Sequence, residues 1–181
     1  MSDLSTHRSV SSAVEARWFV AGDVGVDLQA GIDHDKERVD TYHFDSLSET
    51  ASVKRRGRRR LFEEKWRVGA PTPFVVHGVV GHAEAWRKRR TWKGPKLRGP
   101  WVDVHKRVWI GPGWEICRIH VAGRQSWTVA LSLPAHWSGQ HAAEIEPWWP
   151  VLRDRGIAAS YPAWLIASNE ELADCRDSAA G

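Results

Sequence analysis

Lysine and arginine side chains gather in two segments of this sequence, and such clusters could bind a polyanion. Residues 54–67 contain 8 basic residues and residues 86–107 contain 9, against 3 acidic residues in the two segments together. The rest of the chain holds 9 basic and 19 acidic residues, so the net charge of +4 hides a strong separation of charge. A local positive field attracts anions even when the whole molecule is nearly balanced.

Strand alternation selects the basic side chains that would share one face of a sheet. In a strand over residues 61–68, Glu63, Lys65 and Arg67 point the same way, and Lys54 and Arg56 are their expected cross-strand neighbours. Cations that face one another repel unless carboxylates, water or a bound anion lie between them. Since arginine holds phosphate oxygens in pairs and lysine acts as a compact point charge, a phosphate compound would supply the missing charge.

Other parts of the basic segments allow two interpretations. The run from Arg58 to Arg60 is expected to be a solvated hairpin tip. Lys88 and Arg90 share a strand face with two tryptophans, which could be a binding surface or an edge strand with long side chains lying along apolar surface. The chain is rich in tryptophan, with 12 residues, and we expect most of them in the core. A groove in which exposed tryptophans stack bases beside arginines is the nucleic-acid alternative.

Several function classes lack their motifs in this sequence. It contains no Walker A loop, nucleophile elbow or dinucleotide fingerprint, so nucleophilic catalysis has no specific support. Cys117 and Cys175 lie too far apart to suggest a disulfide framework or a metal knuckle, and the 9 histidines lack close ligand spacing. With no apolar run of about 20 residues and no apolar centre near the N-terminus, we expect a cytoplasmic protein without a membrane partner.

The elements that must position these side chains are mostly short strands. We expect strands at residues 14–20, 50–56, 61–68, 74–80, 85–92, 101–110, 114–121 and 126–133, separated by turns rich in glycine and proline. Helical spacing of apolar residues predicts a helix over residues 142–155 and a second, short one over residues 162–167. Repeated strands divided by such turns indicate an antiparallel sheet or barrel rather than alternating strands and helices.

The domain organisation follows from length and composition. A chain of 181 residues with 42% hydrophobic content can bury one core, and we place this single domain at residues 13–167. Residues 1–12 are polar and rich in serine, while residues 168–181 are small and acidic. We expect both to be flexible tails.

Five short motifs occur in the order of a known family. They are Glu15-Ala-Arg17-Trp-Phe, Arg38-Val-Asp40-Thr-Tyr42, Phe62-Glu63-Glu-Lys65-Trp-Arg67, Val104-His-Lys106-Arg107 and Ser160-Tyr161-Pro-Ala-Trp-Leu165. Together they resemble the strands and the C-terminal element of the CYTH superfamily, the triphosphate tunnel enzymes. The resemblance implies an α+β, mostly antiparallel fold, in which a CYTH-like β-barrel encloses a tunnel and carries a few flanking helices.

The same resemblance implies a site. Glu15 and Glu63 would be catalytic residues and ligands of Mg²⁺ or Mn²⁺, and basic side chains would hold the phosphates of a triphosphate-bearing small molecule. The basic residues that we assign to phosphate binding are Arg17, Lys54, Arg56, Lys65, Arg67, Lys88, Lys106 and Arg107. If the protein is an enzyme, the implied activity is that of a triphosphatase, a phosphoanhydride hydrolase.

Departures from the family pattern concern the metal ligands. Ala13 replaces the first glutamate of the first strand, and Thr128, Ala130 and Ser132 occupy the strand face where the family places two late carboxylates. A site that has lost its metal ligands can still bind an anion but can no longer catalyse metal-dependent hydrolysis. The alternative is therefore a noncatalytic module whose basic face binds nucleic acid or an acidic partner, and a purely structural protein is a third option.

Overall fold

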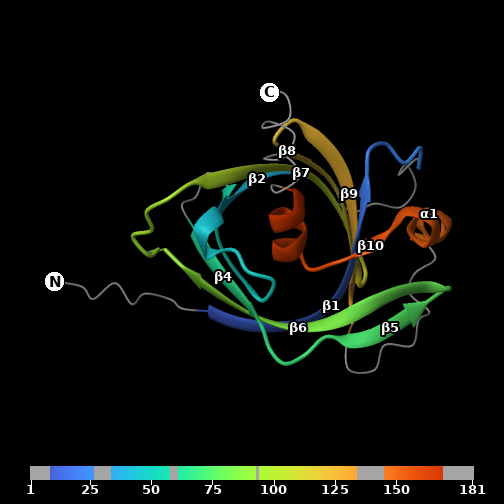
Figure 1. Cartoon of the computed structure of the whole chain (residues 1–181), viewed down its shortest axis with the longest axis horizontal. Helices are drawn as coiled ribbons and strands as arrows, with labels where there is room; N and C mark the ends of the chain where they lie inside the picture. Colours follow the sequence, from blue (N-terminus) through green and yellow to red (C-terminus); the bar gives the residue numbers. More distant parts are fainter. Residues whose placement is uncertain (1–8, 27–33, 58–60, 93, 134–144, 169–181) are drawn as a thin grey trace, which may run out of the picture.

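A computed structural model describes residues 9–26, 34–57, 61–92, 94–133 and 145–168 of the chain. Most of these residues lie in β-strands (Figure 1). The strands are β1 (Ser9–Ala21), β2 (His34–His43), β3 (Ala51–Arg56), β4 (Leu61–Arg67), β5 (Thr72–Val76), β6 (Val79–Thr91), β7 (Trp101–Gly111), β8 (Trp114–Val121), β9 (Arg124–Ser132) and β10 (Ile157–Ala158). The helices are η1 (Phe44–Ser46), α1 (Trp148–Arg155) and one over residues 161–168, which we call the inner helix.

Eight antiparallel strands close into a barrel. Their order is β1-β9-β8-β7-β2-β3-β4-β6, and β6 pairs back with β1 to complete the ring. The long strands β1 and β6 make this closure possible, because the first half of β1 pairs with β6 and the second half pairs with β9. The expected mostly antiparallel barrel with a few helices is confirmed.

An apolar layer covers one side of the barrel from outside. On β1, the residues Ala16, Trp18 and Val20 are fully buried and face α1 and the β5–β6 hairpin rather than the barrel interior. Trp148 of α1 packs on Trp127 of β9, with ring centroids 5.3 Å apart. Much of the tryptophan content is therefore core material, as expected from the sequence.

A second apolar cluster lies inside the barrel, where the inner helix enters it (Figure 1). Tyr161 and Leu165 of this helix are buried among Phe19, Tyr42 and other inward side chains of the strands. The Ser160 hydroxyl accepts a hydrogen bond from the Ala163 backbone N–H at 3.2 Å, which caps the start of the helix. This cluster fills part of the interior and leaves the remainder to polar side chains.

Three element boundaries differ from the sequence expectations. The single strand expected over residues 74–80 is a hairpin, because His77 and Gly78 adopt positive φ angles of 48° and 76° and reverse the chain. The first long helix begins at Trp148, and residues 142–144 of its expected range lie outside the described residues. Strand β1 begins at Ser9, four residues before the domain boundary that the sequence suggested.

Two further expectations concern the turn after β3 and the presence of a membrane-spanning helix. Gly57 ends β3 with a φ of 58°, as expected for a turn, and the basic run that follows it lies outside the described residues. In the described part of the chain, none of the helices has the length and apolar character needed to span a bilayer.

Candidate anion-binding tunnel

The polar part of the barrel interior encloses a cavity of about 160 Å³. All eight barrel strands and the inner helix contribute side chains to it, and we call it the tunnel cavity. Its lining consists of Glu15, Arg17, Arg38, Tyr42, Ser52, Lys54, Arg56, Glu63, Lys65, Lys88, Lys106, Glu115, Ala130, Ser132 and Tyr161. At about 30 Å³ for each water in liquid, this volume equals that of about five water molecules.

Positive charge dominates the tunnel cavity. Seven of its lining residues are lysine or arginine, and three are glutamate, with the fully buried Asp40 beside them as a fourth carboxylate. Among the described residues, these groups leave an excess of three positive charges. An enclosed site with an excess of one sign concentrates ions of the opposite sign.

Glu15 forms the first of three ion-pair clusters. Its two carboxylate oxygens accept hydrogen bonds from Lys65 Nζ at 3.0 Å and Lys88 Nζ at 2.8 Å, and Arg17 lies 3.7 Å away. Burial alone would raise the pKa of Glu15, but these three cations outweigh it and hold the pKa well below its usual range. Glu15 is therefore ionised at neutral pH.

Asp40 is the centre of the second cluster. Its carboxylate lies 3.2 Å from Lys54 Nζ, 3.1 Å from Lys106 Nζ and 3.4 Å from Arg38 Nε. The side chain has no exposed surface, so burial would raise its pKa, yet the surrounding cations lower it strongly. Asp40 neutralises cations that three different strands bring together.

Glu63 completes the arrangement on the adjacent strand. It lies 3.2 Å from Lys54 Nζ and 3.7 Å from Arg56, and it accepts a hydrogen bond of 2.9 Å from Arg90 Nε. Burial opposes ionisation, but Lys54, Arg56 and Arg90 lower the pKa of Glu63 to about 2. Each of these carboxylates is therefore already matched with several cations.

Glu115 is the remaining carboxylate of the tunnel cavity, and no sequence motif pointed to it. It accepts a hydrogen bond of 3.2 Å from Arg17, whose other terminal nitrogen donates to Thr128 Oγ1 at 2.8 Å. Burial would raise the pKa of Glu115, but Arg17, Arg38 and Lys106 lower it to about 2. The inward alternation of Glu115, Cys117 and Ile119 along β8 is the sequence signal that could have identified it.

Two stacked tyrosines close the end of the tunnel cavity at the inner helix. The rings of Tyr42 and Tyr161 are stacked at 5.5 Å, and Lys106 Nζ lies 3.9 Å from the centre of the Tyr161 ring. The Tyr42 hydroxyl accepts hydrogen bonds of 3.4 Å from Lys54 and Lys106. The buried Tyr161 hydroxyl has no hydrogen-bond partner within the described part of the chain. A ligand in the cavity could provide that partner.

The structure places six of the eight cations selected from the sequence around the tunnel cavity. These are Arg17, Lys54, Arg56, Lys65, Lys88 and Lys106. Arg67 lies elsewhere, in a neighbouring pocket of about 240 Å³, where it donates a hydrogen bond of 2.9 Å to Glu84. Arg38, Asp40 and Tyr161 belong to motifs of the family resemblance, but we did not select them as site residues. For Arg38 and Asp40, the alternation along β2 was the available signal.

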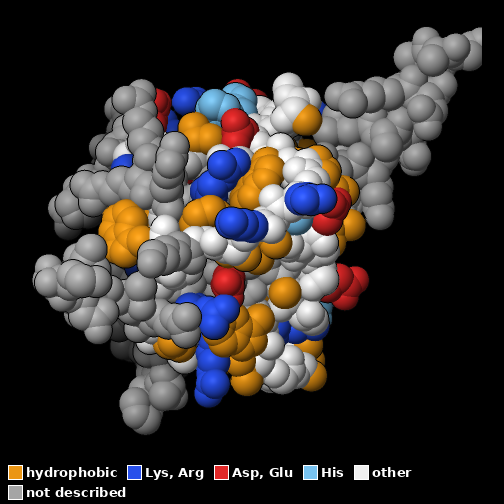
Figure 2. Space-filling model, turned by 90° about the vertical axis from the view of Figure 1, so that its left-hand side faces the viewer, with side chains coloured by type: hydrophobic (Ala, Val, Ile, Leu, Met, Phe, Trp, Pro, Cys, Tyr) orange, Lys and Arg blue, Asp and Glu red, His pale blue; other side chains and the backbone are white. Residues whose placement is uncertain are grey.

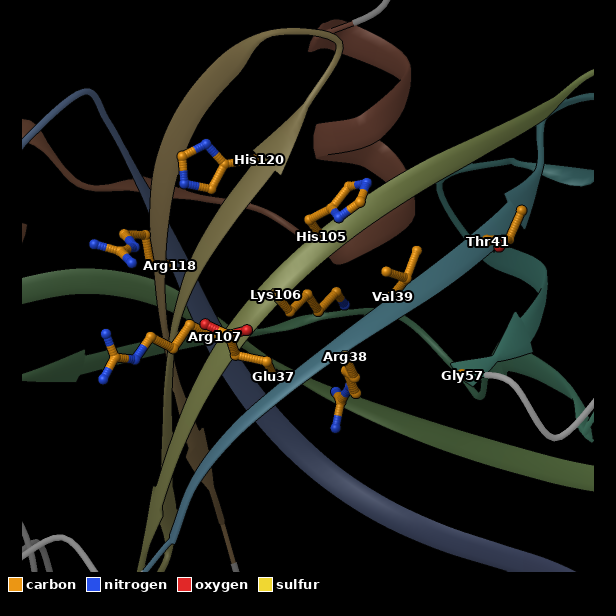
Figure 3. A pocket seen from close by; sticks show the side chains of 10 residues that line it. All are labelled: Glu37, Arg38, Val39, Thr41, Gly57, His105, Lys106, Arg107, Arg118 and His120. Atoms are coloured by element: carbon orange, nitrogen blue, oxygen red, sulfur yellow. The ribbon is translucent and has the colours of Figure 1, made fainter.

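Arg107 lies on the outer face of the barrel, because its neighbour Lys106 occupies the inward position of β7. It lines an outer groove of about 740 Å³ together with residues of β2 and β8 (Figure 3). Arg107 is directly opposite Arg118, and His105 is directly opposite His120, in the β7–β8 ladder. Arg107 therefore lies on the opposite face of β7 from Lys106 and does not line the tunnel cavity.

The carboxylates do not fit the Mg²⁺ or Mn²⁺ centre that the family resemblance implied. Such ions require several oxygen ligands around one point. Glu15 and Glu63 belong to separate clusters, and each is contacted by three cations that a metal would have to displace. Within the described ranges, no three His, Cys, Asp or Glu side chains are grouped to hold a metal. The late strand contributes only Ala130 and Ser132, as expected.

Comparison with protein-family models, curated proteins and solved structures finds no match to this chain.

Proposed function

We propose that the tunnel cavity binds the phosphate chain of a triphosphate-bearing small molecule. One observation carries this proposal: seven basic side chains from six strands converge on one enclosed cavity and outnumber the carboxylates by three. A ligand with several negative charges along a short chain can pair with cations that are spread around the wall of the cavity. A singly charged ion would satisfy only part of them.

The geometry favours a small phosphate compound over a nucleic-acid strand. The tunnel cations point into a barrel whose interior is partly filled by the inner helix, and the cavity has a volume of about 160 Å³. A nucleic-acid duplex offers its phosphates to an open surface. The interior cations therefore suit the end of a phosphate chain that can enter the barrel.

Binding, rather than hydrolysis, is the function that the geometry supports. Metal-dependent hydrolysis by Glu15 and Glu63 stays a prediction of the family resemblance, and the engaged carboxylates give it no support. Its test is the release of phosphate from tripolyphosphate in the presence of Mg²⁺. Metal-dependent release that Glu15→Gln abolishes would establish an enzyme.

The binding proposal predicts that tripolyphosphate raises the thermal stability of the purified protein, because a ligand of the folded state stabilises it. We expect Lys88→Gln to weaken tripolyphosphate binding about tenfold or more, since it removes one charge-assisted contact of about 1.5–3 kcal/mol. Isothermal titration calorimetry measures the affinity. Lys88 lines the tunnel cavity, and its side chain is 23% exposed.

Arg89→Gln provides the matched control. Arg89 follows Lys88 on β6, points to the opposite face and pairs with Glu64, so this variant loses the same charge outside the tunnel. We expect its affinity to stay within about threefold of wild type. Equal losses in the two variants, or no stabilisation of wild type by millimolar tripolyphosphate, would refute the proposal.

A further inference from the structure

Glu15 bridges two lysines that lie side by side on adjacent strands of the barrel. Lys65 of β4 and Lys88 of β6 are directly opposite in the ladder, and like charges in this position repel. Each lysine donates a hydrogen bond to a different oxygen of the Glu15 carboxylate, at 3.0 Å and 2.8 Å. A carboxylate oxygen thus lies where each ammonium group would otherwise contact a phosphate oxygen.

Asp40 differs from Glu15 in its access to the cavity. The Asp40 side chain is fully buried behind the lining, with lysines and arginines on several sides, so a ligand cannot take its place. Glu15 lines the tunnel cavity itself, and its side chain is 11% exposed. Of these two carboxylates, Glu15 is therefore the one that a ligand in the cavity can displace.

We infer that Lys65 and Lys88 form a phosphate subsite that Glu15 occupies until a metal-free phosphate group displaces it. This inference rests on the proposed function. The phosphate group takes the two lysine hydrogen bonds from the carboxylate, which turns away or takes up a proton. Because Glu15 competes with the ligand for the same cations, it lowers the affinity rather than contributing a metal contact.

The first arm of the test uses the wild-type protein. Tripolyphosphate is titrated into it in EDTA, and then in excess Mg²⁺. We expect binding in EDTA that is at least as tight as in Mg²⁺, because the metal neutralises part of the ligand charge that the lysines recognise. Binding that requires Mg²⁺ would overturn the inference while leaving the proposed function intact.

The second arm uses Glu15→Gln, which keeps the side-chain shape and removes the competing charge. We expect its affinity for tripolyphosphate in EDTA to rise at least tenfold. The unliganded variant should melt at a lower temperature, because Lys65 and Lys88 lose their shared partner, and tripolyphosphate should restore more stability than in wild type. At pH 6.5 Lys65 is charged in the wild-type protein. Because Glu15 raises the pKa of Lys65, the variant is also titrated at pH 5.5, where a lysine with a further lowered pKa regains its charge.

Glu84→Gln is the matched control. Glu84 is directly opposite Glu15 in the β1–β6 ladder, and its side chain is also 11% exposed, but it pairs with Arg67 outside the tunnel cavity. An affinity within about threefold of wild type would show that the gain in Glu15→Gln is local rather than a general effect of net charge.

The outcomes separate the two proposals. Tighter binding by Glu15→Gln alone, in EDTA, supports the inference. Wild-type binding that Glu15→Gln weakens or leaves unchanged overturns the inference but keeps the tunnel as a binding site. Absence of tripolyphosphate binding by wild type and Glu15→Gln, with or without Mg²⁺, refutes the proposed function and the inference together.

Discussion

At the scale of the residue, Lys65 shows how burial and ion pairing compete. Burial lowers the pKa of Lys65 and the pair with Glu15 raises it, while Arg17 and Lys88 add to the lowering. The result is a pKa lowered to about 8, although the partner carboxylate of Glu15 stays ionised. A lysine that titrates near 8 changes the charge of the tunnel cavity in mildly alkaline solution.

We predict that tripolyphosphate affinity falls as the pH rises above about 8, because Lys65 loses its charge there. In the unfolded chain Lys65 has its ordinary pKa of about 10.5 and keeps its proton to higher pH than in the folded protein. Between pH 8 and about 10.5 the unfolded state therefore binds more protons than the folded state. The contribution of Lys65 to the free energy of unfolding must therefore increase with pH in this window. Calorimetric titrations at pH 7, 8 and 9 measure the affinity.

Lys65→Arg tests the assignment, since arginine stays charged over this range. Its tripolyphosphate affinity should depend less on pH between 7 and 9 than that of wild type. Parallel pH profiles in the two proteins would show that another group causes the change.

At the scale of the element, the inner helix determines how deep the tunnel cavity is. Phe19 of β1 stacks on Trp164 of this helix at a centroid distance of 4.7 Å, and Leu165 is fully buried. These contacts hold Tyr161, at the first turn, in the lining of the tunnel cavity. The helix therefore serves both as core and as one wall of the site (Figure 1).

We predict that replacement by phenylalanine affects ligand affinity at Tyr161 and stability at Tyr42. Tyr161→Phe removes a hydroxyl without a partner among the described residues, so the free energy of unfolding should change by less than about 0.5 kcal/mol. Its tripolyphosphate affinity should fall about threefold to tenfold, because the hydroxyl donates to the bound ligand. Urea unfolding and calorimetric titration measure the two quantities.

Tyr42→Phe is the comparison for this prediction. The Tyr42 hydroxyl accepts hydrogen bonds from Lys54 and Lys106, so its loss should destabilise the unliganded protein by about 1–3 kcal/mol. A Tyr161→Phe variant that loses as much stability as Tyr42→Phe, with unchanged affinity, would contradict the assigned role of Tyr161.

At the scale of the whole molecule, closing the barrel separates inward from outward charge. Seven cations line the tunnel cavity, while others, such as Arg89 and Arg107, remain outside. On the face shown in Figure 2, lysine and arginine side chains lie among apolar and acidic ones. Of the 17 basic residues in the two basic segments, five line the tunnel cavity: Lys54, Arg56, Lys65, Lys88 and Lys106.

This arrangement predicts a preference between ligands. Tripolyphosphate should raise the melting temperature, whereas a single-stranded oligonucleotide with a 5′-hydroxyl end should not, since its phosphates carry one charge each on a bulky strand. Melting curves at 50 and 200 mM salt compare the two. Oligonucleotide binding that weakens steeply with salt and is unaffected by Lys88→Gln would instead support the noncatalytic nucleic-acid module.

The sequence by itself determined most of the strands, the antiparallel class and the sets of site residues that share a strand face. A period of two residues is local information, so it places Glu15 with Arg17 on one strand face and Glu63 with Lys65 on another. The same rule applied to β7 requires Lys106 and Arg107 to point to opposite faces. Lys106 and Arg107 had been grouped only because both are basic. That the inward cations bind a phosphate compound stays a prediction.

Only the tertiary structure decided which charges meet. Glu15 reaches Lys65 and Lys88 across 50 and 73 positions of sequence, and Arg17 reaches Glu115 across 98. Such partners depend on the register between strands that pair only when the barrel closes, which no local pattern encodes. The sequence therefore indicated a basic interior. The closed barrel showed that its carboxylates are held by lysine and arginine, which is the reason to expect phosphate binding without a metal.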